Sequence, residues 1–249
     1  MNLKVKFEAY LLLVLLSSCG SEPKPEPVFP LPSLAHDVRI SIADQIIRLP
    51  LVAISTRRTV CSAKDKFCGL PIEKIEANQP IVVNSLDIPL EGYSRFPDYR
   101  TEGSIWFPEI CKMLSQEWAR RVCLTTPAEK HIDFHGIGEF TLVREDSVNL
   151  LERIQLGNCC SVSELLKKMK FIDKTPSSYC QLDKQGRPAS LCVAAIKVRN
   201  NLLAVWIVTR AGAEKYRIIR DAEIILAFMQ FGIGETENFQ ALDSVLNTH

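Results

Sequence analysis

Cysteines constrain the fold of this chain more than any other residue type. The sequence contains nine. All but one lie between positions 61 and 192, and they are Cys61, Cys68, Cys111, Cys123, Cys159, Cys160, Cys180 and Cys192. An even number of cysteines in an oxidising compartment predicts up to four disulfides. Eight cysteines allow about a hundred pairings, so the sequence alone leaves the connectivity open.

The remaining cysteine, Cys19, ends an apolar segment at the N-terminus. Two lysines precede the apolar run 9–16, and two serines separate that run from Cys19. Leu16-Ser17-Ser18-Cys19 resembles the lipobox of bacterial lipoproteins, which implies cleavage before Cys19 and acylation of its sulfur and amino group. An ordinary secretory signal is the alternative. The apolar run is far shorter than the roughly 20 residues of a membrane-spanning helix.

This resemblance implies a domain organisation and a location. Residues 1–18 form a signal peptide, and residues 19–36 carry the lipid anchor and a stiff tether of roughly 40 Å with five prolines. Residues 37–249 form an α+β periplasmic domain, with a possible subdomain boundary near 157–160. Gly20, rather than Asp, follows the cysteine, which resembles the sorting signal for the outer membrane. We therefore expect the protein on the periplasmic face of the bacterial outer membrane, lipid-anchored.

The charge balance indicates no nucleic-acid partner. Removal of residues 1–18 takes away Lys4, Lys6 and Glu8, which leaves 28 of 30 basic side chains and 28 of 29 acidic ones. A mature chain without net charge lacks the basic excess that is typical of nucleic-acid-binding proteins.

Two cysteine pairs are close in sequence and favour local bridges. Cys61 and Cys68 would close a short loop. Cys180 and Cys192 would join the base of a hairpin whose turn lies at 183–186. These two pairings are our local expectations.

Cys111 and Cys123 are predicted not to pair with each other. The apolar spacing from Pro108 to Val122 favours one helix, in which the two cysteines would lie about 18 Å apart. The adjacent Cys159 and Cys160 are then the natural partners.

Hydrophobic periodicity predicts an α+β fold with mainly antiparallel sheet, because strands and helices are mixed without βαβ alternation. The residues at 148–154 are ambiguous between helix and strand. Strands are expected at 38–42, 45–49, 51–55, 81–83, 86–90, 140–143, 191–198 and 202–209, with another beginning at Ser104. Helices are expected at 108–122, at 162–170 behind a capping box, and at 221–231, capped by Asp221 and ended by Gly232.

Motifs of common enzyme classes are missing from the sequence. It contains no Gly-x-Ser-x-Gly, no His-Glu-x-x-His, no P-loop and no dinucleotide-binding glycine pattern. We therefore expect no enzymatic activity and no cofactor. The alternative is an anchored hydrolase whose catalytic residues meet only in the fold.

His131 and His135 are the one candidate metal pair. On a helix their spacing would bring both rings to one face, where Asp133 could complete a zinc site. The apolar pattern around them favours strand and loop instead. Residues four apart on a strand are separated by about 13 Å, so we expect no metal site.

The best candidate contact site is the loop that Cys61 and Cys68 would close. It carries four basic side chains, namely Arg57, Arg58, Lys64 and Lys66. A clamped basic loop would be preorganised to bind an acidic partner, although a solvated loop without a binding role is the simpler alternative.

A family resemblance points to one kind of partner. Residues 38–50 (VRISIADQIIRLP) resemble the opening β-hairpin and proline of periplasmic immunity lipoproteins that neutralise type VI secretion lipase effectors. The resemblance implies a protein that blocks the active-site cleft of a secreted phospholipase or lipase toxin. A toxin that attacks peptidoglycan would fit equally. The alternative role is a structural or assembly accessory lipoprotein of an envelope machine.

Overall fold

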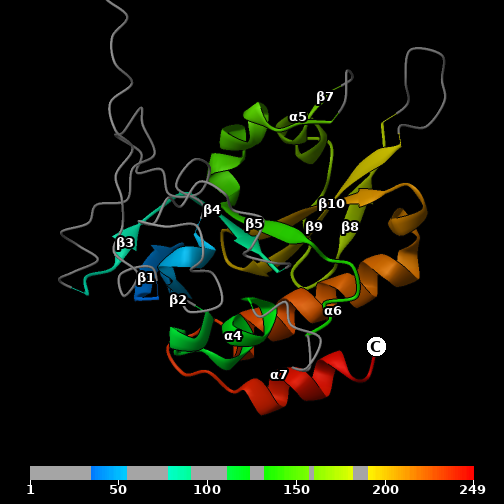
Figure 1. Cartoon of the computed structure of the whole chain (residues 1–249). Helices are drawn as coiled ribbons and strands as arrows, with labels where there is room; N and C mark the ends of the chain where they lie inside the picture. The colour runs from blue at the N-terminus through cyan, green and yellow to red at the C-terminus, as the bar shows by residue number, and fades with distance from the viewer. Residues whose placement is uncertain (1–34, 55–77, 91–110, 124–131, 157–159, 182–189) are drawn as a thin grey trace, which may run out of the picture.

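The largest element of the fold is a five-stranded antiparallel sheet (Figure 1). The computed structural model describes residues 35–54, 78–90, 111–123, 132–156, 160–181 and 190–249. Across the sheet the strands are β4 (Ser85–Pro89), β5 (Glu139–Arg144), β10 (Leu202–Thr209), β9 (Leu191–Arg199) and β8 (Ser177–Tyr179). The expected α+β class with mainly antiparallel sheet is confirmed.

The hairpin β9–β10, which the sequence predicted, forms the centre of this sheet. Both strands are rich in β-branched and apolar residues, which fit a pleated, buried surface. Asn201 in the turn has φ 61°, a left-handed conformation that asparagine tolerates better than most residues.

A second sheet contains three strands, β2 (Gln45–Pro50), β1 (Asp37–Ile42) and β3 (Ile81–Val82). The β1–β2 hairpin turns at Ala43 and Asp44, whose φ angles of 46° and 62° suit a two-residue hairpin turn. Val38, Ile40 and Ile42 alternate toward the core, as expected.

The strand expected at 51–55 is wrong over the residues that are described. Leu51–Ala53 form a 3-10 turn, η1, in which Ile54 N donates to Leu51 O over 3.0 Å. Residues 51–54 are all buried. An apolar run this short has no periodicity that separates a strand from a buried turn.

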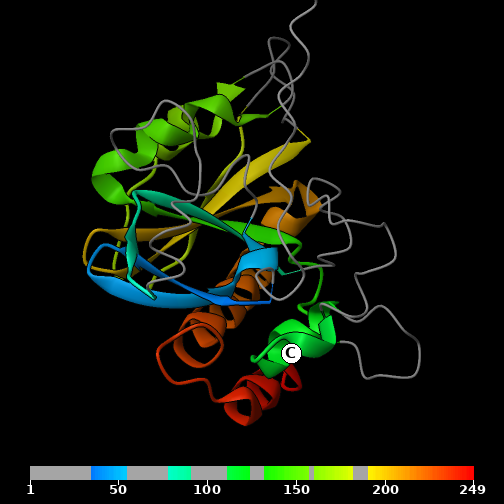
Figure 2. The ribbon, with the colours of Figure 1, turned by 60° about the vertical axis from the view of Figure 1, so that its left-hand side comes forward.

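Helices cover one face of the five-stranded sheet. The long helix α6 (Lys215–Phe231) crosses beneath it, and α4 (Glu117–Cys123) and α7 (Phe239–Leu246) lie further out (Figures 1 and 2). Helix α6 begins at Lys215, so Asp221 does not cap it as expected. Asp221 is buried inside the helix and accepts from Arg220. The expected end at Gly232 is confirmed, whereas α7 was not anticipated.

The opposite face is covered by residues 145–156 and 160–171. They form the 3-10 segment η3 (Glu145–Arg153), the short strands β6 (Gln155–Leu156) and β7 (Cys160–Ser161), and helix α5 (Val162–Leu166). The predicted capping box is confirmed, because Ser161 Oγ accepts from Glu164 N and Glu164 Oε2 accepts from Ser161 N. Helix α5 is shorter than the expected 162–170.

Alternation along the central strands divides the apolar side chains between two clusters. On β10, Leu202, Ala204 and Trp206 pack toward α6, whereas Leu203 and Val205 pack toward α5. Covered on both faces, the first half of β10 is buried at every residue. In the described part of the chain, no helix is long and apolar enough to cross a bilayer.

The disulfides correct one of the expected pairings. Cys111 and Cys123 are bonded to each other, with Cα atoms 5.4 Å apart, so the predicted partners Cys159 and Cys160 were wrong for them. The single helix expected at 108–122 is broken. Residues 111–113 are helical, the chain bends at 114–116, and α4 starts at Glu117, which returns Cys123 to Cys111.

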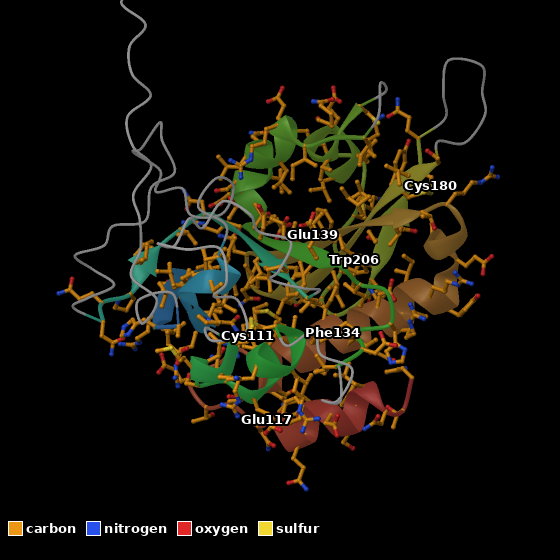
Figure 3. All side chains as sticks on the ribbon, in the orientation of Figure 1. Cys111, Glu117, Phe134, Glu139, Cys180 and Trp206 are labelled. Atoms are coloured by element: carbon orange, nitrogen blue, oxygen red, sulfur yellow. A yellow bond between two sulfur atoms is a disulfide. The ribbon has the colours of Figure 1, made fainter. Side chains whose placement is uncertain are left out.

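The expected bond between Cys180 and Cys192 is present, with Cα atoms 4.4 Å apart (Figure 3). Cys160 is also disulfide-bonded. Cys61, Cys68 and Cys159 lie outside the described residues, as does the proposed 61–68 bridge.

Candidate functional site

The sheet opens between its two central strands. Pairing of β5 with β10 ends at Thr141 and Val205. Beyond that point β5 continues to Glu139 beside β4, and β10 continues to Thr209 beside β9. Here β5 is still paired with β4, and β10 with β9, but β5 and β10 are no longer paired with each other. Among the described residues, the β5-facing edge of Trp206–Thr209 therefore has no strand partner.

A cavity of about 900 Å³ lies at this opening. Its lining comes from η3 and β6, from residues 135–138, from the N-terminal half of α6, and from the ends of β5 and β10. In Figure 3, Glu139 of β5 and Trp206 of β10 lie near each other at the centre of the molecule, and both line this cavity. We call it the β5–β10 cleft.

Strand β10 changes from fully buried to partly exposed at the point where the cleft begins. The strand is buried through Trp206, and then Ile207 and Thr209 are exposed while Val208 between them is buried. Ile207 is 42% exposed, because the layer of η3 and α5 covers only the first half of the sheet. An aliphatic side chain therefore lies open in the cleft.

Two polar pairs in the cleft are internally satisfied. Thr141 Oγ1 donates to Asp87 Oδ1 over 2.6 Å across the β4–β5 pair. On α6, Arg220 donates to Asp221 Oδ1 over 2.6 Å and to the carbonyl oxygen of His135 over 3.1 Å. These contacts hold the walls in place.

Two charged side chains in the cleft form no ion pair in the described part of the chain, although Arg217 lies near enough to Glu214 and Asp221 for their charges to act on it. The side chain of Glu139 is exposed and forms no hydrogen bond or ion pair there. Arg217 donates from Nε to Tyr216 Oη over 2.8 Å, and that hydrogen bond raises the pKa of its guanidinium. The cleft thus presents one free carboxylate and one cation without an ion pair.

The indole of Trp206 carries an unused donor. The side chain is 3% exposed, and its Nε1 has no hydrogen-bond acceptor among the described residues. A buried donor without an acceptor costs about 1–3 kcal/mol.

Most candidate site residues singled out in the sequence lie outside the described part of the chain, and His135 alone of them lines the cleft. Arg57, Arg58, Lys64 and Lys66 fall outside the described residues, so the basic-loop contact site stays a prediction. The lipidation site Cys19 and the histidine His131 also fall outside them.

His135 is held by structural contacts. Its Nε2 lies 2.9 Å from the carbonyl oxygen of Leu246, and its backbone N donates to Asp133 Oδ1 over 2.7 Å. Within the described ranges, no group of three metal-ligating side chains occurs.

Sequence reasoning missed the cleft for a definable reason. Residues 202–209 form an unbroken apolar run up to Thr209, and Ile207 looks like the core residues before it. The one local cue is the polar pattern of 139–141 on β5, where Glu139 and Thr141 flank the buried Phe140.

Comparisons with protein-family models, with curated proteins and with solved structures find no match for this chain.

Proposed function

We propose that this chain is a membrane-anchored periplasmic lipoprotein that binds and neutralises a toxic effector, namely a type VI secretion phospholipase or lipase. The β5–β10 cleft carries the proposal. Among the described residues it combines a strand edge without a strand partner, an exposed aliphatic side chain at Ile207, and the charges of Glu139 and Arg217, which form no ion pair there. Such a mixture of apolar and polar groups is typical of protein-recognition surfaces.

The lipobox and the proline-rich tether supply the second support. A triacylated Cys19 would hold the protein at the membrane, since each buried CH2 contributes roughly 0.8 kcal/mol. The tether would place the folded domain in the periplasm, where a toxin that attacks the envelope acts.

A toxicity-rescue assay tests the proposal. The product of the adjacent open reading frame is exported to the periplasm of a test bacterium, with and without this protein. We expect growth arrest that this protein relieves and that reappears when residues 1–18 are deleted. Cys19→Ala, expressed to the same level, separates the need for the anchor from the need for export.

A titration separates inhibition from catalysis. The purified mature chain is added to the effector, and lipase activity is measured on phospholipid vesicles. An inhibitor gives a break at one equivalent, whereas an enzyme that destroys the effector acts far below one equivalent. A harmless neighbour, or a toxin that this protein does not inhibit, would contradict the proposal and favour the assembly role.

A further inference from the structure

We infer that the β5–β10 cleft receives an extended segment of the partner protein as an added strand, paired along Trp206–Thr209. This inference rests on the proposed function and names the part of the molecule that would carry it. The occupant is a peptide segment with apolar side chains, one basic residue and one acidic residue.

The backbone supplies the first argument. Trp206–Thr209 are held in a regular strand by β9, with Trp206 opposite Ala194 and Thr209 opposite Leu191. Their β5-facing backbone groups have no strand partner among the described residues. An extended peptide would satisfy these groups by main-chain hydrogen bonds, which give affinity independent of its sequence. The strand is already ordered, so binding costs it little conformational entropy.

The side chains supply the second argument. On a strand, alternate residues point to opposite faces, and an added strand would follow the same alternation. On one face it would meet Ile207 and Leu151, and on the other Trp206 and Val208, all of which line the cleft. Apolar residues of the partner would cover Ile207, whose side chain is 42% exposed.

Charge gives the third argument. Glu139 and Arg217 line the same cleft, and neither has an ion-pair partner in the described part of the chain. A partner segment with one basic and one acidic side chain would neutralise both. Charges of both signs also exclude a uniformly acidic or uniformly basic segment, because one end would then meet a like charge.

Hydrogen exchange reads out strand addition directly. The probe is the purified effector, inactivated at its catalytic residue, mixed with the mature chain. We expect the β5-facing amides within Trp206–Thr209 to exchange at least tenfold more slowly in the complex. The amides at the start of β10, already paired on both sides, serve as the internal reference.

Two variants with matched controls test the side chains. Glu139→Lys and Ile207→Asp should each weaken binding at least tenfold. Glu152→Lys changes an exposed glutamate outside the cleft, and Ile172→Asp changes an isoleucine that is 64% exposed, so both controls should bind within twofold of wild type. Thermal unfolding of all four checks that they are folded.

The outcomes separate the two proposals. A wild-type chain that binds no effector overturns both. A wild type that binds and inhibits, with cleft variants of unchanged affinity or with protection confined to residues outside Trp206–Thr209, overturns the strand addition and leaves the inhibitor role standing.

Discussion

Phe228 is the residue around which the larger apolar cluster is organised. Its ring lies on the inner face of α6 and meets three other rings edge-on, those of Trp118, Phe134 and Phe140, at centroid distances of 4.7, 5.6 and 6.1 Å. These rings come from α4, from the segment before β5 and from β5 itself. Edge-to-face contacts each contribute about 0.5–1.5 kcal/mol beyond burial.

Gly232, at the end of α6, lies against that ring. A Cβ at this position would lie 2.8 Å from Phe228 Cδ2 and 2.9 Å from the carbonyl oxygen of Phe228. The φ angle of Gly232 is −96°, so close approach, and not a left-handed backbone, requires glycine here.

Gly232→Ala is expected to destabilise the protein by about 1–3 kcal/mol, because the added methyl group must displace Phe228 or the helix end. Gly234→Ala is the control, since its Cβ would meet no atom closer than 4.0 Å. Urea unfolding of the two variants gives the comparison. Equal stability of both would show that the helix end relaxes freely.

At the scale of elements, two short helices are capped in different ways. Helix α5 carries its own capping box at Ser161 and Glu164, three residues apart. Helix α4 receives its cap from a distant carboxylate, because Glu237, in the connection before α7, accepts from Glu117 N over 2.9 Å. The first cap is visible in the sequence, and the second depends on the packing of α7 against α4.

The two carboxylates have pKa values shifted in opposite directions. The backbone N–H and hydroxyl of Ser161 lower the pKa of Glu164 below its ordinary 4.5. Burial raises the pKa of Glu237 above 4.5, more than the backbone N–H groups of Glu117 and Trp118 lower it. Ionisation of Glu164 therefore favours the folded state, whereas ionisation of Glu237 opposes it.

Glutamine variants at the two sites should show opposite pH dependence. The stabilisation from Glu164 is complete above its unfolded pKa of about 4.5 and disappears as pH falls through its lower folded pKa. Glu164→Gln should thus lose stability relative to wild type at neutral pH and converge with it in acid.

The contribution of protonated Glu237 is complete below about pH 4.5 and is lost as pH rises through the raised folded pKa. Glu237→Gln should gain stability relative to wild type over that rise, while its amide oxygen still accepts from Glu117 N. Urea unfolding from pH 3 to 8 measures both differences. If the stability difference from wild type changed with pH in the same direction for both variants, the opposite pKa shifts of Glu164 and Glu237 would be refuted.

At the scale of the whole molecule, the two disulfides with both cysteines among the described residues fasten different parts of the fold. Cys111–Cys123 ties the turn before α4 to its end, and Cys180–Cys192 ties the chain after the edge strand β8 to β9. Both bonds span a sequence separation of 12, so in the chain-entropy model they restrict the unfolded chain equally.

Replacing each pair by alanine is expected to cost about 2–4 kcal/mol. The loss should be larger for Cys111→Ala/Cys123→Ala, because both of those cysteines are buried, whereas Cys180 is only partly buried. Unfolding of the two double variants in urea, each beside wild type, gives the two values. A larger loss of stability for Cys180→Ala/Cys192→Ala would show that the burial of Cys111 and Cys123 contributes little.

The positions of the main strands and hairpins were largely predictable, because alternation and turn chemistry act within a few residues. The hairpins β1–β2 and β9–β10, the capping box at Ser161 and the end of α6 at Gly232 follow from local sequence. The turn at Leu51–Ala53 does not, because an apolar run buried on all sides has no periodicity.

The fold class, the main strands and the lipobox-like segment at Cys19 can be read from the chain before it folds, since each depends on neighbouring residues. The pairing of Cys111 with Cys123, the distant cap from Glu237 and the β5–β10 cleft arise only when the chain packs. Disulfides and caps join whichever groups the packed chain brings together. An apolar residue such as Ile207 is open or covered according to where the neighbouring layer ends, and the sequence of its own strand does not contain that information.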